Sequence, residues 1–161
     1  MPDQVRHDRI QNLVSTVSVV VGLRKRKNWR CKISMKIALA QINPTVGDFE
    51  HNTEKMMGFI EKAKGLSCDL IVFSEMVISG YPPLDLLERR DFVATNLRYL
   101  HKLVETVTGI GVICGFVDEN PDQEGYPLYN SAVLFDTGKI LHRAHKRLLP
   151  DYDVYDERMY F

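Results

Sequence analysis

The sequence predicts an α/β fold in which helices pack against a mixed β-sheet. Three observations indicate this class. Apolar runs rich in β-branched residues, such as Leu70 to Phe73, are typical of strands. Apolar residues step by four and three between 91 and 107, which is typical of an amphipathic helix. A turn of hairpin type at 136–139 separates two strand-like runs, so antiparallel pairs are expected beside parallel ones.

The expected elements follow one another from residue 36. Strands are expected at 36–42, 69–74, 111–117, 131–135 and 140–146, a short helix at 84–87, and a longer one at 91–107. Before the second strand, Asn52 is expected to cap a helix that carries an apolar stripe and ends at Gly65. The run from Leu70 to Phe73 is expected to be a parallel strand with helices on both of its faces.

The composition describes about one domain of 161 residues, of which 45% are apolar. Its charge is uneven, because residues 1–34 have a balance of +6 and residues 35–161 a balance of −6. An acidic body argues against nucleic acid as a partner. The longest apolar stretch, at 13–23, is too short to span a membrane. The three cysteines are far apart and form no CxxC pair, which favours the reducing cytoplasm and no metal site.

Residues 1–34 differ from the rest in composition, with six basic residues between Arg24 and Lys32. The basic cluster follows the apolar run instead of preceding it, which is not the order of a signal peptide. We expect a disordered extension, or translated upstream DNA with the true start at Met35. On either interpretation, deletion of this segment is expected to leave the thermal unfolding midpoint nearly unchanged.

Glu75 directly follows an expected strand, at the end of a strand where ligands bind in α/β folds. It is a candidate general base, and the alternative is a solvated residue. The Gly80-Tyr81-Pro82-Pro83 turn is expected to hold Tyr81 over it. Lys146 ends the last expected strand. If its strand neighbours that of Glu75, the ammonium could stabilise an oxyanion beside the base, whereas a surface ion pair is the alternative.

Other residues are weaker candidates for chemistry. Gly109, Gly111 and Gly115 have the wrong spacing for a dinucleotide site and do not join a strand to a helix. His142 and His145 would face opposite sides of a strand, which argues against a shared metal. Cys114, in mid-strand between apolar residues, is more typical of a buried hydrophobe than of a nucleophile. The tail at 151–161 has three tyrosines and Glu157, which could hold a small zwitterion.

From Met35 on, the chain resembles the nitrilase, or carbon–nitrogen hydrolase, superfamily. Within it, the chain is most similar to the N-terminal glutamine amidotransferase domains of glutamine-dependent NAD synthetases. The stretches that carry the resemblance are KIALAQINPTVGDFEHN, DLIVFSEMVISGYPPLDLL, YNSAVLF and HRAHKRLLPDYDVYDERMYF. The resemblance implies a nitrilase-like α-β-β-α sandwich of which residues 35–161 form the N-terminal half.

The family uses a Glu–Lys–Cys triad, and the resemblance assigns the base to Glu75 and the lysine to Lys146. It places Tyr81, Tyr152, Tyr155 and Glu157 around a glutamine substrate. The family's nucleophilic cysteine follows the lysine, and no cysteine follows Lys146 here. The resemblance therefore implies a fragment of a glutaminase that supplies ammonia for amidation of deamido-NAD, inactive by itself.

The resemblance implies ATP and magnesium only for a separate synthetase domain, no cofactor in this segment, and a homo-oligomeric full-length protein. Two alternatives stay open. One is a fragment of another carbon–nitrogen hydrolase, such as an ω-amidase, against which the pocket tyrosines argue. The other is a non-catalytic module that uses the pocket, or an exposed edge of its sheet, to bind a ligand or a partner chain.

Overall fold

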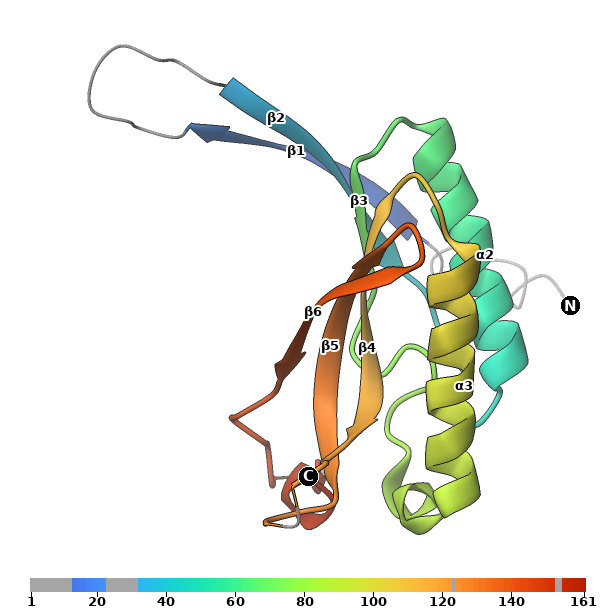
Figure 1. Cartoon of the computed structure of the whole chain (residues 1–161), viewed down its shortest axis with the longest axis vertical. Coiled ribbons are helices and arrows are strands. Elements are labelled where there is room, and N and C mark those ends of the chain that lie inside the picture. Colours follow the sequence, from blue (N-terminus) through green and yellow to red (C-terminus); the bar gives the residue numbers. More distant parts are fainter. Residues whose placement is uncertain (1–12, 23–31, 123, 153–154) are drawn as a thin grey trace, which may run out of the picture.

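The computed structural model describes residues 13–22, 32–122, 124–152 and 155–161 (Figure 1). The described residues form six strands, two α-helices and two short 3-10 helices. In order they are β1 (Leu13–Gly22), β2 (Lys32–Gln41), α2 (Phe49–Gly65), β3 (Leu70–Val72), the first 3-10 helix (Leu84–Glu88), α3 (Arg90–Thr106), β4 (Gly111–Glu119), β5 (Leu128–Asp136), β6 (Lys139–His145) and the second 3-10 helix (Glu157–Met159).

The strands form one sheet in the order β1-β2-β3-β4-β5-β6. The pairs β2–β3 and β3–β4 are parallel, and the other three pairs are antiparallel. This architecture confirms the predicted α/β class with a mixed sheet. Each parallel pair is joined through a helix, and each antiparallel pair from β4 onward by a direct loop, as the order of sequence patterns indicates.

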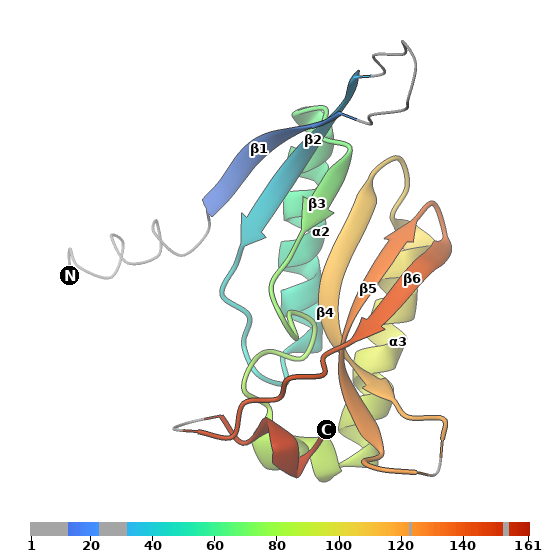
Figure 2. The ribbon, with the colours of Figure 1, turned by 90° about the vertical axis from the view of Figure 1, so that its left-hand side faces the viewer.

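Helices α2 and α3 both pack on the same face of the sheet, as the two perpendicular views show (Figures 1 and 2). The expectation that helices cover both faces of the strand at Leu70 is therefore wrong. The connections from β2 to β3 and from β3 to β4 advance in one direction across the sheet. Right-handed crossovers that advance in one direction must place their helices on one face.

The core lies between this face and the helices. Fully buried residues of β3, β4 and β5, such as Ile71, Phe116 and Phe135, alternate with residues that point to the other face. On the opposite face Leu39, Ala132 and Ala144 are exposed. In the described part of the chain, helices cover one face of the sheet, and no helix covers the other (Figures 1 and 2).

Asn52 does not cap helix α2, which begins three residues earlier with Asp48 as its N-cap. Asn52 is fully buried and instead links two loops. Its side chain pairs with both backbone groups of Thr45 and donates to the carbonyl of Ile78 at 3.1 Å. The capping prediction was wrong because an asparagine also satisfies buried backbone groups, a use that local sequence does not distinguish from a cap.

Part of the N-terminal segment is a strand. β1 pairs with β2 over all ten of its residues, from Leu13 to Gly22. Its run of valines and a threonine has high β-propensity, and β2 offers it an open edge. The expectation of disorder is wrong for residues 13–22, and residues 1–12 and 23–31 lie outside the described part. β2 also begins at Lys32, before Met35, so the strand crosses the expected boundary.

The pairing reverses our expectation for a deletion. Removing residues 1–22 should uncover the edge of β2 and lower the thermal unfolding midpoint, by roughly 3 °C for each kcal/mol lost. A second variant lacking only residues 1–12 is the reference, so the difference between the two variants isolates β1. Equal midpoints, measured by circular dichroism, would show that β1 contributes nothing to stability.

Candidate functional site

Three strand ends meet at one edge of the sheet. β4 runs parallel to β3, while β5 and β6 each run antiparallel to the strand before them. β3 and β6 therefore end at the same edge at which β5 begins, as Figure 2 shows from the uncovered face. Glu75 follows β3, Lys146 follows β6, and Asn130 lies near the start of β5. The topology thus gathers a carboxylate, an ammonium and an amide.

Glu75 and Lys146 are in direct contact, with 2.8 Å between Oε1 and Nζ. Their strands are not neighbours, because β4 and β5 separate β3 from β6. The predicted contact is therefore present, but it does not arise in the way the sequence suggested. It requires the chain after β3 to cross the sheet toward β6.

Gly115 of β4 makes that crossing possible. A Cβ atom at this position would lie 2.4 Å from the backbone nitrogen of Met76 and 2.6 Å from Cα of Glu75. Any side chain on Gly115 would therefore displace the backbone that carries Glu75. Its register partners across the sheet, Ala132 and then Ala144, are also small, so space is left open beside the two charged groups.

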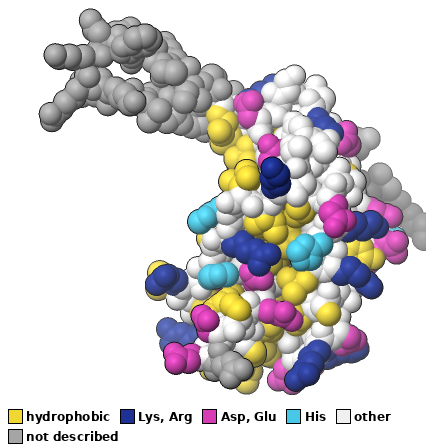
Figure 3. Space-filling view, in the orientation of Figure 1, with side chains coloured by type: hydrophobic (Ala, Val, Ile, Leu, Met, Phe, Trp, Pro, Cys, Tyr) yellow, Lys and Arg dark blue, Asp and Glu magenta, His cyan; other side chains and the backbone are white. Residues whose placement is uncertain are grey.

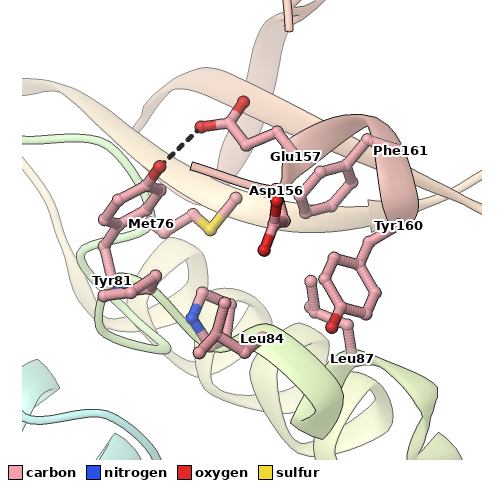
Figure 4. A pocket seen from close by; sticks show the side chains of 10 residues that line it. Met76, Tyr81, Leu84, Leu87, Asp156, Glu157, Tyr160 and Phe161 are labelled. Atoms are coloured by element: carbon pink, nitrogen blue, oxygen red, sulfur yellow. Dashed lines mark hydrogen bonds between the residues drawn. The ribbon is translucent and has the colours of Figure 1, made fainter. Parts of the chain in front are cut away.

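Glu157 is the third charged member of the cluster. Its side chain is only 5% exposed, and its two oxygens lie 3.0 and 2.9 Å from Nζ of Lys146. The Tyr81 hydroxyl donates a hydrogen bond to Oε1 of Glu157 at 2.8 Å (Figure 4). Tyr81 therefore contacts Glu157, whereas the sequence led us to expect it over Glu75. Two carboxylates share one ammonium, and neutral donors supply the remaining hydrogen bonds.

The surroundings set the protonation of these groups. Burial acts to raise the pKa of Glu75, but hydrogen bonds from Lys146 and Asn130 outweigh it and hold the pKa below its ordinary value. Burial acts to lower the pKa of Lys146, and its hydrogen bonds to Glu75 and Glu157 hold that pKa above its ordinary value. Burial and the hydrogen bond to Glu157 raise the pKa of Tyr81. At neutral pH, Glu75 is a carboxylate, Lys146 an ammonium, and Tyr81 a neutral donor.

The other two predicted pocket tyrosines lie on the tail. The rings of Tyr81 and Tyr155 are 6.2 Å apart between centroids, and those of Tyr152 and Tyr155 are 5.6 Å apart. Tyr152 is 67% exposed. The structure thus brings Tyr155 toward the charged cluster through Tyr81, while Tyr152 forms the outer end of this row of rings.

A cavity of about 350 Å³ opens at the cluster on the uncovered face, and its lining includes Glu75, Gly115, Asn130 and Lys146. This volume is within the range of small-ligand sites. The cavity drawn in Figure 4, between the proline turn and the tail, measures about 20 Å³ and has room for little more than one water molecule. The cavity of about 350 Å³ is the candidate site, because the charged cluster lines it.

A larger groove of about 1020 Å³ lies between α3 and β6 on the helix side of the sheet. On this side of the molecule, hydrophobic side chains (yellow) are exposed between basic, acidic and histidine side chains (Figure 3). His145 lines this groove, and its ring nitrogen lies 2.7 Å from the Ser131 hydroxyl. His142 and His145 belong to opposite faces, as predicted, and no cluster of possible metal ligands occurs among the described residues.

Neither described cysteine can serve the cluster. Cys114 is fully buried on the helix-covered face, one residue from Gly115, whose side of the strand faces the cavity. Burial raises the pKa of its thiol to about 12, so it is not a nucleophile at neutral pH. Cys68 is also buried, and both are free thiols. Cys31 lies outside the described residues.

Sequence reasoning missed two residues of this site. Asn130 lies within the YNSAVLF stretch, which suggested only a strand, and no local pattern shows that its amide faces two carboxylates. Gly115 was considered only as part of a nucleotide-binding motif. A glycine inside an apolar strand is itself a signal for close approach of another backbone, and this signal could have found it.

Comparison with known proteins identifies the family to which this chain belongs. The model of the carbon–nitrogen hydrolase family matches residues 36–161. The chain belongs to this family. No helix of the described part is long and apolar enough to cross a membrane.

The chain is similar to glutamine-dependent NAD(+) synthetases. It is 40% identical over 129 residues to the enzyme of Thermotoga maritima, covering 79% of this chain and 22% of that protein. Among solved structures, the glutamine-dependent NAD+ synthetase of Acinetobacter baumannii superposes with a TM-score of 0.72 at 38% identity, over 79% of this chain and 23% of that one. An amidase from Nesterenkonia shares the fold, with a TM-score of 0.64 at 24% identity, over 79% of this chain and 47% of that one. The chain therefore spans less than a quarter of the length of these synthetases.

Proposed function

We propose that this chain supplies the general base and the cationic partner of a glutamine-hydrolysing site. The observation that carries the proposal is the contact of Lys146 with both Glu75 and Glu157, at 2.8 and 2.9 Å, beside an open cavity. Glutamine is proposed as the substrate because the relatives are glutamine-dependent enzymes. The free, buried thiols support a reducing compartment such as the cytoplasm.

The proposed chemistry divides amide hydrolysis into two steps. Glu75, held as a carboxylate, takes the proton from a nucleophilic thiol as the sulfur attacks the amide carbon. Lys146 stabilises the negative charge that forms on the amide oxygen. The proton then passes to the departing ammonia, and water, deprotonated by the same carboxylate, releases glutamate and restores the thiol. In the family the nucleophile is a cysteine, and neither Cys68 nor Cys114 is placed to act.

We therefore expect the purified 161-residue chain to release no ammonia from glutamine above background. Without the nucleophile, the base and the lysine lose most of their effect, because such groups act as a unit. The measurement is ammonia release by the chain and by Cys114→Ala. Turnover that disappears in Cys114→Ala would contradict the assignment of the site. Turnover that survives it would indicate Cys31 or a contaminating amidase, which Cys31→Ala distinguishes.

A further inference from the structure

Asn130 is the residue that joins all the charged groups of the cluster. It is only 3% exposed. Its Nδ2 donates to Oε1 of Glu75 and, at 3.2 Å, to Oε2 of Glu157. Its backbone carbonyl accepts the N–H of Lys146 at 2.8 Å. One strand residue thus contacts both carboxylates through its side chain and fixes the lysine through its backbone.

We propose that Asn130 is a positioning residue, which holds Glu75 in place as the base by bridging it to Glu157 around Lys146. The inference rests on the proposed function for the meaning of Glu75 as a base. Nothing in the sequence patterns or in the family comparison assigned a role to Asn130.

Charge and geometry explain why an amide suits this position. The ammonium of Lys146 is already shared by Glu75 and Glu157, so the cluster has one more negative than positive charge. A neutral amide adds hydrogen-bond donors without adding charge, and its two N–H groups diverge at a fixed angle. Both can therefore be directed at the two carboxylates, whereas an aspartate of the same shape would present acceptors to acceptors.

The backbone makes the bridge rigid. Asn130 lies within β5, paired on one side with Val117 of β4. Glu75, in contrast, lies on a loop, and its side chain is 44% exposed. A loop carboxylate that serves as a base must be held within hydrogen-bond reach of its proton donor. The strand-borne amide supplies this restraint, and Lys146, with a long flexible side chain, cannot supply it alone.

A merely structural asparagine offers a matched control. Asn96 is fully buried too, and its Nδ2 donates to the carbonyl of Val117 at 2.6 Å. Among the described residues, this hydrogen bond joins Asn96 to a backbone carbonyl and involves no charged group. Replacing Asn96 or Asn130 with alanine removes a buried amide in both cases, but only Asn130→Ala removes a donor from the carboxylate of Glu75.

The experiment is a carbon-13 NMR titration of the Glu75 carboxyl in the full chain, with Glu75→Gln to assign the signal. Asn130→Ala is expected to move the titration midpoint up by about one pH unit, because a lost charge-assisted hydrogen bond has that effect. Asn96→Ala is expected to leave the midpoint unchanged. An unchanged midpoint in folded Asn130→Ala would overturn the proposal, as would an equal shift in Asn96→Ala.

If Asn130→Ala does not fold, exchanging the donor and the acceptor of the Asn130–Glu75 hydrogen bond tests the proposal instead. Asn130→Asp sets a third carboxylate against Glu75, and adding Glu75→Gln restores an amide–carboxylate hydrogen bond with the roles reversed. The double variant is expected to have a ratio of folded to unfolded chain at least about tenfold higher than Asn130→Asp alone at pH 7. No recovery would overturn the proposal. Both experiments are independent of ammonia release, so a failed glutaminase proposal would leave their results interpretable.

Discussion

Gly115→Ala is expected to lower the free energy of unfolding by about 3 kcal/mol, the upper end of the usual cost of overpacking. The added Cβ would meet backbone atoms of Glu75 and Met76 at 2.4 to 2.8 Å, and backbone cannot move aside as the end of a side chain can. Since the same backbone carries the base, the contact between Glu75 and Lys146 should be lost with it. Urea unfolding measures the first effect.

Gly111→Ala in the same strand is the matched control. There the nearest atom to an added Cβ is Cδ1 of the Leu70 side chain, at 3.1 Å. A side-chain end can rotate, so a loss below about 1 kcal/mol is expected. Equal losses in the two variants would show that the backbone crossing at Gly115 is not the tight contact described.

Lys146→Met is expected to cost about 2–3 kcal/mol at pH 7. The substitution keeps an unbranched side chain that is one atom shorter, but it leaves Glu75 and Glu157 facing each other without a cation. Breaking a fully buried pair costs about 3–5 kcal/mol, and the side chain of Lys146 is 32% exposed, so a smaller loss is expected. Denaturant unfolding from pH 3 to pH 8 measures the loss.

The loss should depend on pH in a defined direction. The pKa of Glu75 lies below its ordinary value of 4.5 in the folded chain, so its contribution to stability is present above that pH and is lost as the pH falls below it. The difference between the wild type and Lys146→Met should therefore shrink at acid pH. Lys64→Met is the control, because Lys64 is equally exposed, at 33%, but pairs with the exposed Glu61. Its loss should stay below about 1 kcal/mol at every pH.

The sequence predicted most of the sheet and helices, because each strand and helix carries its own apolar period. Helix α3 shows this clearly, since Val93, Leu100 and Val104 on its apolar stripe are buried and Leu97 is partly exposed. The layer arrangement was harder to predict. Whether helices cover one face or two depends on the order of the strands in the sheet. This order is set by which strands pair with each other, and the sequence of a single strand does not show its partners.

In the candidate site, too, local sequence predicted individual residues but not how they are arranged. Glu75 and Lys146 could be found because they stand at strand ends, where polar groups interrupt apolar runs. Their contact depends on Gly115 and on the crossing loop, and these involve residues distant in the sequence. For the same reason, the sequence did not predict that Glu157 and Asn130 contact Lys146 and Glu75. Local patterns predict elements, whereas the hydrogen bonds of a cluster follow from the register of the whole sheet.

The titration of Glu75 tests the central claim most directly, namely that this carboxylate is held ionised by Lys146 on the uncovered face of the sheet. In the wild-type chain the carboxyl should titrate below the ordinary value of 4.5, and in Lys146→Met its midpoint should rise. A midpoint at the ordinary value in both proteins would contradict the account, because Glu75 would then be a solvated side chain with no partner in Lys146.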